Sequence, residues 1–380
     1  MLKNKKIEYE AIGVRAELST FTPEGEGVKE HHIILHVEPR GDVFQQQYAR
    51  MTEAEKLLLQ SDEIIGSKMV FKRYFLSDAT NQALLMPQEG DCAVSFIQQP
   101  PLDGSKVALW IYLQDGTDVS CDGKTTIVNH NGYKHLWTMG IYNTENTSYM
   151  QTWQTLFEYI DILKKHDATL LDNCIRTWFF VRDVDTQYGG LVKARRECFI
   201  EQGLTPQTHY ISSTGIGGNP ADPKALVQLG AYAMTGFDPA QQHYLYALSH
   251  LNKTIEYGVT FERGTLFEYG DRGHIYISGT ASINNKGEVL HVGDIVNQTH
   301  RMWENVEELL KEGGMNYDDV MQIIVYLRDT ADYDMVSRMF AEKFPNTPYV
   351  LTLAPVCRPT WLIEMECIAV QKRTTDFRPF

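Results

Sequence analysis

Two carboxylates lie close together in one of the most apolar stretches of the chain. Glu364 and Glu366 alternate with Ile363, Met365 and Cys367. Because successive side chains of a β-strand point to opposite faces, a strand here places both glutamates on the same face. A carboxyl group in an apolar cleft has a raised pKa, which suits a general acid near neutral pH. The alternative is a structural glutamate that pairs with an arginine across an interface.

The strand that carries these glutamates ends a series of elements that recurs along the chain. Apolar residues at helical spacing predict that the series begins with a helix. In the last third, we expect a helix over 294–313, a strand over 320–329, a second helix over 333–344 and two closing strands. In the middle third, the corresponding elements are expected over 149–166, 173–183 and 190–202, again followed by two strands. The first third repeats the order more loosely, over 44–60 and 69–78.

Each recurring block predicts a twisted sheet with two helices on one face. Its first strand ends in an aspartate, at Asp78, Asp183 and Asp329, and the longer second interval is accounted for by the linker-like stretch 236–259. Three such layers can bury their uncovered sheet faces against one another. We therefore expect one α+β body with clefts where neighbouring units meet. The expected units are residues 1–118, 119–258 and 259–380.

The three expected clefts differ at the position of Glu364. Alignment of the repeats places Gln228 there in the middle third, and the corresponding strand of the first third, KVALWIYLQ, has no acid. One of three potential sites therefore has a carboxylate.

Composition limits the classes of function. The 380 residues include 35 Lys and Arg and 49 Asp and Glu, a net charge of −14, and no basic stripe, so nucleic-acid binding is not expected. No apolar run approaches the ~18 residues of a bilayer span, and the first residues lack the apolar core of a secretion signal, so we expect no membrane association and a cytoplasmic location. The six cysteines show no Cys-x-x-Cys spacing and are expected to be reduced thiols.

Two apparent ligand motifs do not carry a cofactor or a metal. The glycines of 214–218 precede Pro220, where a dinucleotide-binding loop would begin a helix, and are better explained by a turn that directs backbone N–H groups towards an anion. His31, His32 and His36 have no neighbouring acid or cysteine, and on a strand His31 points away from the other two. We expect a cofactor-free protein without a metal site.

The stretch over 275–370, which includes IYISGTASI, ENVEELLKEGG, VYLRD and IEMECIAV, resembles the RidA/YjgF superfamily. That family forms homotrimers of chorismate mutase-like subunits with active sites at their interfaces, and this chain is similar to such a trimer fused into one polypeptide. Fusion of this kind is a property of the chorismatases, which hydrolyse chorismate or convert it to hydroxybenzoates. The stretches that specifically resemble chorismatases are STGIGG (213–218), FERGT (261–265), GDRGHIYISGTASI (270–283) and VCRPTWLIEME (356–366).

The resemblance implies that Glu364 is the general acid of a reaction that releases pyruvate. The enolpyruvyl ether of chorismate is cleaved when its methylene carbon is protonated and water captures the resulting oxocarbenium ion. The carboxylate would then stabilise the cation or activate the water. By the same resemblance, Cys357, on the strand before Glu364, would line the pocket and affect the outcome of the reaction. The alternative is a buried thiol.

Chorismate carries two carboxylates, so its pocket needs cationic side chains, ideally arginines. The candidates are Arg176, Arg182, Arg195, Arg196 and Arg263, of which Arg263 and Arg195 are favoured because they fall in the C-terminal half of the chain, which the resemblance covers well. Surface salt bridges and satisfied core hydroxyl groups are the alternative explanations for such arginines and tyrosines. The expected substrate-binding residues are Arg176, Tyr188, Arg195, Thr214, Gly215, Tyr246, Arg263, Ala281 and Glu366.

Two departures from the related families bear on the reaction. RidA-type imine deaminases carry an arginine on the first closing strand, where this chain has Val350, which argues against deaminase chemistry. The segment that carries Pro-Arg in chorismatases reads HYLYALSHLNK (243–253) here. The leading hypothesis is a monomeric, chorismatase-like enzyme with a small anionic substrate. The alternatives are an enamine/imine deaminase and a non-catalytic protein that binds a small molecule.

Overall fold

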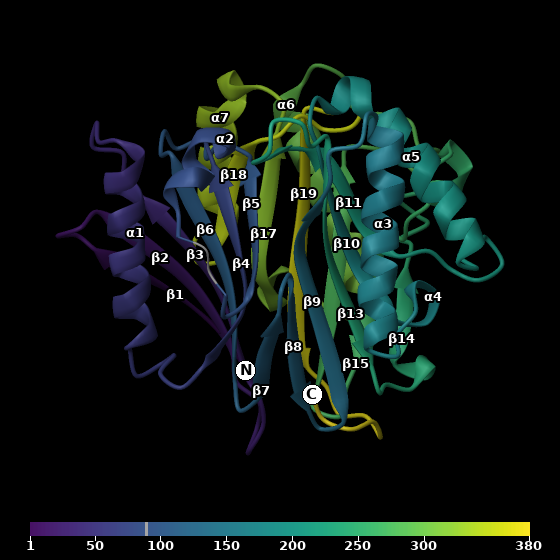
Figure 1. The fold of residues 1–380 in the computed structure, drawn as a ribbon, viewed down its shortest axis with the longest axis horizontal. Coiled ribbons are helices and arrows are strands. Elements are labelled where there is room, and N and C mark those ends of the chain that lie inside the picture. The colour runs from purple at the N-terminus through teal and green to yellow at the C-terminus, as the bar shows by residue number, and fades with distance from the viewer. Residues whose placement is uncertain (88–89) are drawn as a thin grey trace.

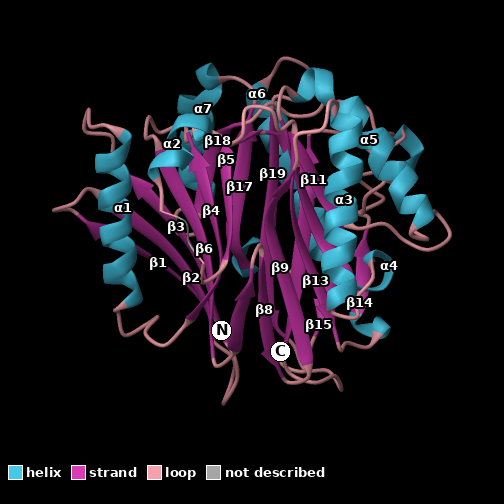
Figure 2. Cartoon of the chain, in the orientation of Figure 1, coloured by secondary structure: helices cyan, strands magenta, loops and turns pink. Residues whose placement is uncertain are grey.

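The computed structural model describes residues 1–87 and 90–380, and its strands form three sheets in the middle of the molecule with helices on the outside (Figure 1, Figure 2). Apart from the short strand β12 (Asn219–Pro220), each sheet is built from one third of the chain. The predicted α+β architecture of three similar fused units is confirmed. Where one unit ends and the next begins stays a proposal.

The first sheet has the strand order β1-β2-β3-β6-β4-β5-β12. Its own strands are β1 (Leu2–Tyr9), β2 (Val14–Phe21), β3 (Lys29–Val37), β4 (Lys68–Leu76), β5 (Ala93–Gln98) and β6 (Val107–Asp115). Helix α1 (Phe44–Leu59) packs on β2, β3 and β6, and the short α2 (Ala79–Gln82) follows β4.

The second sheet has the order β11-β10-β13-β9-β8-β7. Its strands are β7 (Asp118–Asp122), β8 (Thr125–His130), β9 (Tyr133–Tyr142), β10 (Cys174–Val181), β11 (Ser212–Gly217) and β13 (Val227–Thr235). Its helices are α3 (Ser148–Lys165), α4 (Leu170–Asn173) and α5 (Val184–Glu201).

The third sheet has the order β14-β15-β16-β19-β17-β18. Its strands are β14 (Gln242–Leu245), β15 (Gly264–Glu268), β16 (Arg272–Ala281), β17 (Val320–Leu327), β18 (Tyr349–Leu353) and β19 (Ile363–Lys372). Its helices are α6 (Ile295–Glu312) and α7 (Tyr333–Lys343). Short 3-10 helices occupy Ala83–Leu85, Pro239–Gln241, Thr254–Tyr257, Tyr317–Asp319 and Thr330–Asp332.

Helix α5 begins at Val184, earlier than the predicted start at 190. The pair Gly189-Gly190 weakens the helical pattern in the sequence, because glycine is a poor helix former. A Cβ atom at Gly190 would lie 2.3 Å from the Ser148 hydroxyl oxygen, so glycine allows α5 to approach α3 closely. Tertiary packing therefore overrides the local propensity.

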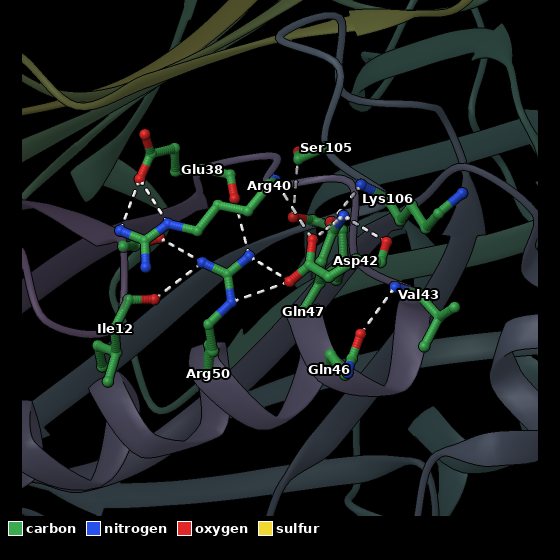
Figure 3. Close-up of polar contacts among 12 residues, drawn as sticks. Ile12, Glu38, Arg40, Asp42, Val43, Gln46, Gln47, Arg50, Ser105 and Lys106 are labelled. Carbon is green, nitrogen blue, oxygen red and sulfur yellow. Dashed lines mark hydrogen bonds and ion pairs between the residues drawn. The ribbon is translucent and has the colours of Figure 1, made fainter.

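The turn before α1 is fixed by an arginine that reaches back from the helix (Figure 3). The Arg50 guanidinium donates to both the Asp42 carboxylate, at 2.6 Å and 3.1 Å, and the Ile12 carbonyl, at 2.8 Å. The Val43 N–H, at the helix start, donates to the Gln46 side chain at 3.1 Å. These bonds satisfy backbone groups that a helix start otherwise leaves open and tie α1 to the β1–β2 turn.

The inner faces of the three sheets share one apolar core, as the predicted packing of sheet faces requires. Residues of β10 and β17 are buried along the whole strand, because helices cover one face and the other two sheets cover the other. The cluster includes Trp110 of the first sheet, Trp178 of the second and Tyr326 of the third. No described helix has the length and apolarity that crossing a membrane demands.

One buried ionic cluster joins the first sheet to the third. The Glu30 carboxylate accepts from Arg272 at 2.5 Å, from His274 at 2.9 Å and from the Tyr112 hydroxyl at 2.6 Å. Glu30 and Arg272 are both 1% exposed or less. Charges removed from water in this way are tolerated only when they are paired and hydrogen-bonded.

We predict that Glu30→Ala lowers the free energy of unfolding by roughly 3–5 kcal/mol, because it leaves buried charge without its carboxylate. Urea unfolding followed by tryptophan fluorescence measures this change. Glu63→Ala, which removes the partner of exposed Lys5, is the control and should change stability by less than about 1 kcal/mol. Equal effects of the two substitutions would contradict the assignment of Glu30 as an inter-sheet ion pair.

Candidate active site

A pocket lies where the second and third units meet. From the second unit it takes residues of α5 and β11, and from the third unit residues of β16, β19 and the loops beside them. The lining residues are Tyr188, Arg195, Ser213, Gly215, Val259, Phe261, Arg263, Gly279, Ala281, Ile283, Cys357, Arg358, Trp361 and Glu364. The sequence-based prediction of a cleft between units is confirmed at this position.

Glu364 is the carboxylic acid of this pocket. It lies on β19, opposite Tyr326 of β17 and Ala281 of β16, and its side chain is 3% exposed. Burial and the nearby negative charge of Glu366 raise its pKa to about 8, and Arg176 and Arg263 offset part of that rise. A carboxyl group with such a pKa is protonated at neutral pH and can donate a proton.

Glu366 lies on the same strand face, and side chains of the second unit donate hydrogen bonds to both of its oxygens. Its Oε1 accepts from Trp178 Nε1 at 2.8 Å, and its Oε2 accepts from Arg176 at 2.8 Å and from the Thr214 hydroxyl. Arg176, Thr214 and Glu366 therefore lie beneath the pocket, bonded to one another. Their predicted contact with a substrate stays a prediction.

Gly279 makes room for the Glu364 carboxyl group. A Cβ atom at Gly279 would lie 2.1 Å from Glu364 Oε1 and 3.1 Å from Thr214 Cγ2. The Gly279 N–H donates to the Thr214 hydroxyl at 2.9 Å, and β16 has an irregular register at this point. The glycine and the bulge together let β16 pass close to the acid.

Cys357 lines the pocket, but its predicted place on a strand is wrong. Strand β18 ends at Leu353, and Cys357 lies in the loop that leads to β19. Pro355 and Pro359, which lack backbone N–H groups, flank this loop segment and disfavour a strand ladder. Burial and the charge of Glu364 raise the pKa of the Cys357 thiol to about 12, with a partial offset from Tyr188. A thiol held protonated is a wall of the pocket rather than a nucleophile.

Two of the arginines that line the pocket are buried. Arg195 of α5 and Arg263, just before β15, line it and are 1% and 3% exposed. Arg263 donates to the Asn252 carbonyl at 3.2 Å, which fixes its direction. Arg182 instead donates to backbone carbonyls beyond β10, and Arg196 lies at the outer cavity next to the pocket.

Tyr188 lies in the pocket and Tyr246 does not. A Cβ atom at Gly215 would lie 3.0 Å from the Tyr188 ring, so the glycine of β11 lets this ring approach the strand closely. The Tyr246 ring lies beside Lys253, at 5.4 Å, and its backbone N–H donates to Glu312 at 2.9 Å. Tyr246 belongs to the segment over 243–253, where this chain departs from the related family, and its different place agrees with that departure.

Several pocket residues were missed by the sequence analysis. Phe261 and Trp361 form apolar walls, and the buried indole Nε1 of Trp361 has no hydrogen-bond partner within residues 1–87 and 90–380. Both residues fall inside stretches that resemble chorismatases, which was the available signal. Arg358 is exposed at the rim. It borders a second, outer cavity of about 930 Å³ that also includes Tyr188 and Cys357 and forms the approach to the pocket.

The equivalent positions in the other two units have no carboxyl group. In the strand registers, Glu364 faces Tyr326, Gln228 faces Phe180 and Ala108 faces Phe75. This confirms the alignment of Gln228 with Glu364. The Gln228 amide donates to Ser95 at 2.9 Å.

The cleft between the first and third units has different chemistry from the pocket. There Glu17 is buried, but His36, Arg15 and Lys6 hold the pKa of its carboxyl group at about 2. Such an acid stays ionised at neutral pH and cannot serve as a proton donor. The described residues contain no cluster of His, Cys, Asp and Glu suited to a metal ion.

Comparison with known proteins places this geometry in context. A family model described as Endoribonuclease L-PSP matches residues 269–371. The 3-aminoacrylate deaminase RutC of Acinetobacter baylyi is 33% identical over 98 residues, 25% of this chain and 77% of that protein. A RutC family protein of Pyrococcus abyssi is 32% identical over 100 residues, 26% of this chain and 79% of that protein. A crystal structure of a chorismatase matches with a TM-score of 0.66 and 17% identity, covering 91% of this chain and 100% of that chain, so the likeness is one of fold.

The raised pKa of Glu364 makes stability depend on pH in a defined direction. Between the ordinary value of 4.5 and about 8, the folded protein keeps a proton that the unfolded chain has released. Stability is therefore lost as the pH rises through this range. Glu364→Gln has no carboxyl group to titrate at this position. We predict that its free energy of unfolding, measured relative to that of the wild type by urea unfolding, rises by roughly 3 kcal/mol between about pH 5 and about pH 8.

The exposed Glu342 of α7 provides the matched control. The free energy of unfolding of Glu342→Gln should differ from that of the wild type by the same amount at about pH 5 and at about pH 8. A constant difference for Glu364→Gln as well would show that Glu364 is ionised throughout.

Proposed function

The chain belongs to the RidA/YjgF family, and we propose that it is a chorismatase-like enzyme that cleaves the enolpyruvyl ether of chorismate and releases pyruvate. The observation that carries the proposal is a buried carboxyl group of raised pKa, Glu364, in a pocket that is also lined by the buried Arg195 and Arg263. The fold shared with a chorismatase over 91% of the chain is consistent with it.

The reaction needs a proton donor at carbon. Protonation of the methylene carbon by Glu364 gives an oxocarbenium ion, and the new carboxylate offsets its positive charge. Water adds to the cation and gives up a proton to Glu364, which restores the acid. The resulting hemiketal then collapses to pyruvate and the ring alcohol. A donor of pKa about 8 holds this proton at neutral pH.

The two arginines match the charge of the substrate. Chorismate is a dianion, and a buried pocket accepts such a ligand only if each carboxylate meets a cation. Arg195 from the second unit and Arg263 from the third enter the pocket from different elements, which suits one carboxylate on the ring and one on the three-carbon chain. Tyr188 lines the same pocket, and its proposed role is to bond a ring hydroxyl of the substrate.

The alternatives are an enamine or imine deaminase and a binding protein without activity. The first is motivated by the name of the Acinetobacter baylyi relative, 3-aminoacrylate deaminase. Val350 of β18 is apolar and buried where deaminases of this fold carry an arginine, and this argues against it. Ribonuclease activity, which the description of the family model names, is not proposed, because the net charge of −14 disfavours binding of a polyanion.

We also propose that the chain acts as a monomer. Three sheets within one chain supply both sides of the pocket, so a second copy is not required to complete it.

The direct test is incubation of the purified protein with chorismate and a coupled assay for pyruvate. We predict release by the wild type and a loss of roughly 10²–10⁴-fold in kcat for Glu364→Gln, because the amide cannot donate a proton to carbon. Glu342→Gln on the surface of α7 is the control and should retain full activity. Absence of pyruvate release by the wild type would contradict the proposed function. Full activity of Glu364→Gln would contradict the assignment of Glu364 as the acid.

A substitution that leaves the acid in place but displaces it tests the geometry. Gly279→Ala puts a Cβ atom 2.1 Å from Glu364 Oε1, so the carboxyl group must move by about 1 Å, and we predict a fall in kcat of roughly 10²-fold. Gly90→Ala is the control, since a Cβ atom there meets nothing within 4 Å, and should leave kcat unchanged. Retention of activity by Gly279→Ala would contradict the position assigned to Glu364.

A further inference from the structure

Arg73 of β4 is a fully buried charged residue that the proposed reaction does not use. It is fully buried, and its Cζ lies 4.9 Å from the centre of the Trp110 ring, 4.8 Å from that of Trp178 and 5.0 Å from that of Phe180. Aromatic faces attract a guanidinium but do not replace its lost hydration by themselves. A cation in such a place therefore needs an anionic partner.

That partner is Glu366 of the third unit. Arg73 Nη1 lies 3.6 Å from Glu366 Oε1. Arg176 contacts the other carboxylate oxygen, Oε2, at 2.8 Å. Within the part of the chain that the structure describes, the Arg73 nitrogens have no hydrogen-bond partner. Glu366 is thus held between one arginine of the first unit and one of the second.

The arrangement breaks the equivalence of the three units. In the strand registers, Arg73 faces Trp110, Trp178 faces Gly230 and Ile324 faces Glu366. The place that holds Glu366 in the third unit thus holds an indole in the first unit and no side chain in the second. The arginine of the first unit fits only because the third unit supplies its carboxylate.

Glu366 is two residues from Glu364 on the same face of β19, so its charge acts on the acid of the pocket. Thr214 connects the two sites, because its hydroxyl donates to Glu366 and accepts from the N–H of Gly279, which packs on Glu364. The titratable and charged groups around the two carboxylates are Arg73 of β4, Arg176 of β10, Tyr188 and Arg195 of α5, Arg263 before β15, Tyr326 of β17, Cys357 and Arg358 of the β18–β19 loop, and Cys367 of β19.

We propose that Arg73 is a positioning residue for Glu364: it holds Glu366 in place and offsets its charge, and so sets the pH at which the acid of the pocket loses its proton. The first unit, which has no acid at the equivalent position, thereby takes part in the reaction. The inference rests on the proposed function, in which Glu364 is the proton donor.

The test measures the protonation of Glu364 directly rather than turnover. Protein labelled with carbon-13 glutamate is titrated from about pH 5 to about pH 10 by infrared spectroscopy, and the band of the protonated carboxyl group is assigned by its absence in Glu364→Gln. We predict that Arg73→Met raises the pKa of Glu364 by about 1 unit, because a cation is lost, and that Glu366→Gln lowers it by at least about 1 unit, because an anion is lost. Arg73→Lys, which keeps the charge, should restore the wild-type pKa.

The sign separates this role from a merely structural one. A loosened core admits water, which would lower the pKa of Glu364 rather than raise it. An unchanged or lowered pKa of Glu364 in Arg73→Met would overturn the proposal. Arg338→Met, on the exposed face of α7, is the control and should leave the pKa of Glu364 unchanged. If Arg73→Met does not fold, the double variant Arg73→Met/Glu366→Gln removes two opposite charges together, and its pKa must exceed that of Glu366→Gln alone.

The outcome is independent of the substrate assignment. If the pKa shifts are found but no pyruvate is released from chorismate, the proposed function fails and the role of Arg73 stands. If pyruvate is released but Arg73→Met leaves the pKa in place, the role of Arg73 fails alone.

Discussion

Glu364 and Glu366 lie on one face of the buried strand β19, where two carboxylates repel each other and lose their hydration. The side chains around them offset these two costs to different extents. Glu366 is balanced by Arg176, Arg73 and the Trp178 indole, contributed by two other sheets. Glu364 is not balanced to the same extent, and its pKa rises to about 8. A carboxyl group that stays protonated at neutral pH because of its surroundings is typical of acid–base catalysis. The three sheets therefore have to meet at this point for either glutamate to be tolerated.

Fusion of three units into one chain makes such unequal surroundings accessible. In a trimer of identical subunits, any residue near the axis appears three times, so an arginine such as Arg73 would face copies of itself. Here the places equivalent to Arg73 hold Trp178 and Ile324, and those equivalent to Glu366 hold Trp110 and Gly230. The residues at the position of Glu364 in the other two units are Gln228 and Ala108, so one cleft has an acid there. The other buried ion pair between units, Glu30 with Arg272, follows the same rule, with the anion in one unit and the cation in another.

The elements were predictable to the extent that local patterns determine them. The helix over 295–312 and the strand over 320–327 have the predicted places, because apolar periodicity and the Asp294 cap are written in the nearby sequence. The predicted residues that meet in the pocket are Glu364, Cys357, Arg195, Arg263, Tyr188, Gly215 and Ala281.

Contacts between distant parts of the chain were not predictable. Arg73 and Glu366 are separated by about three quarters of the sequence, and nothing near Arg73 marks it as part of a site. Gly279 could be recognised as necessary only once the position of the Glu364 carboxyl group was known. Val350 shows the opposite case, where the absence of an arginine at one local position was informative by itself.

The central claim is that Glu364 protonates carbon, so that the bond broken joins the ether oxygen to the three-carbon chain. Turnover of chorismate in oxygen-18 water, followed by mass spectrometry of the ring product, tests this most directly. The account predicts that the ring product keeps its original ether oxygen and carries no label, while pyruvate trapped at once by reduction carries it. Label in the ring alcohol would mean that water attacks the ring instead, and would contradict the role assigned to Glu364.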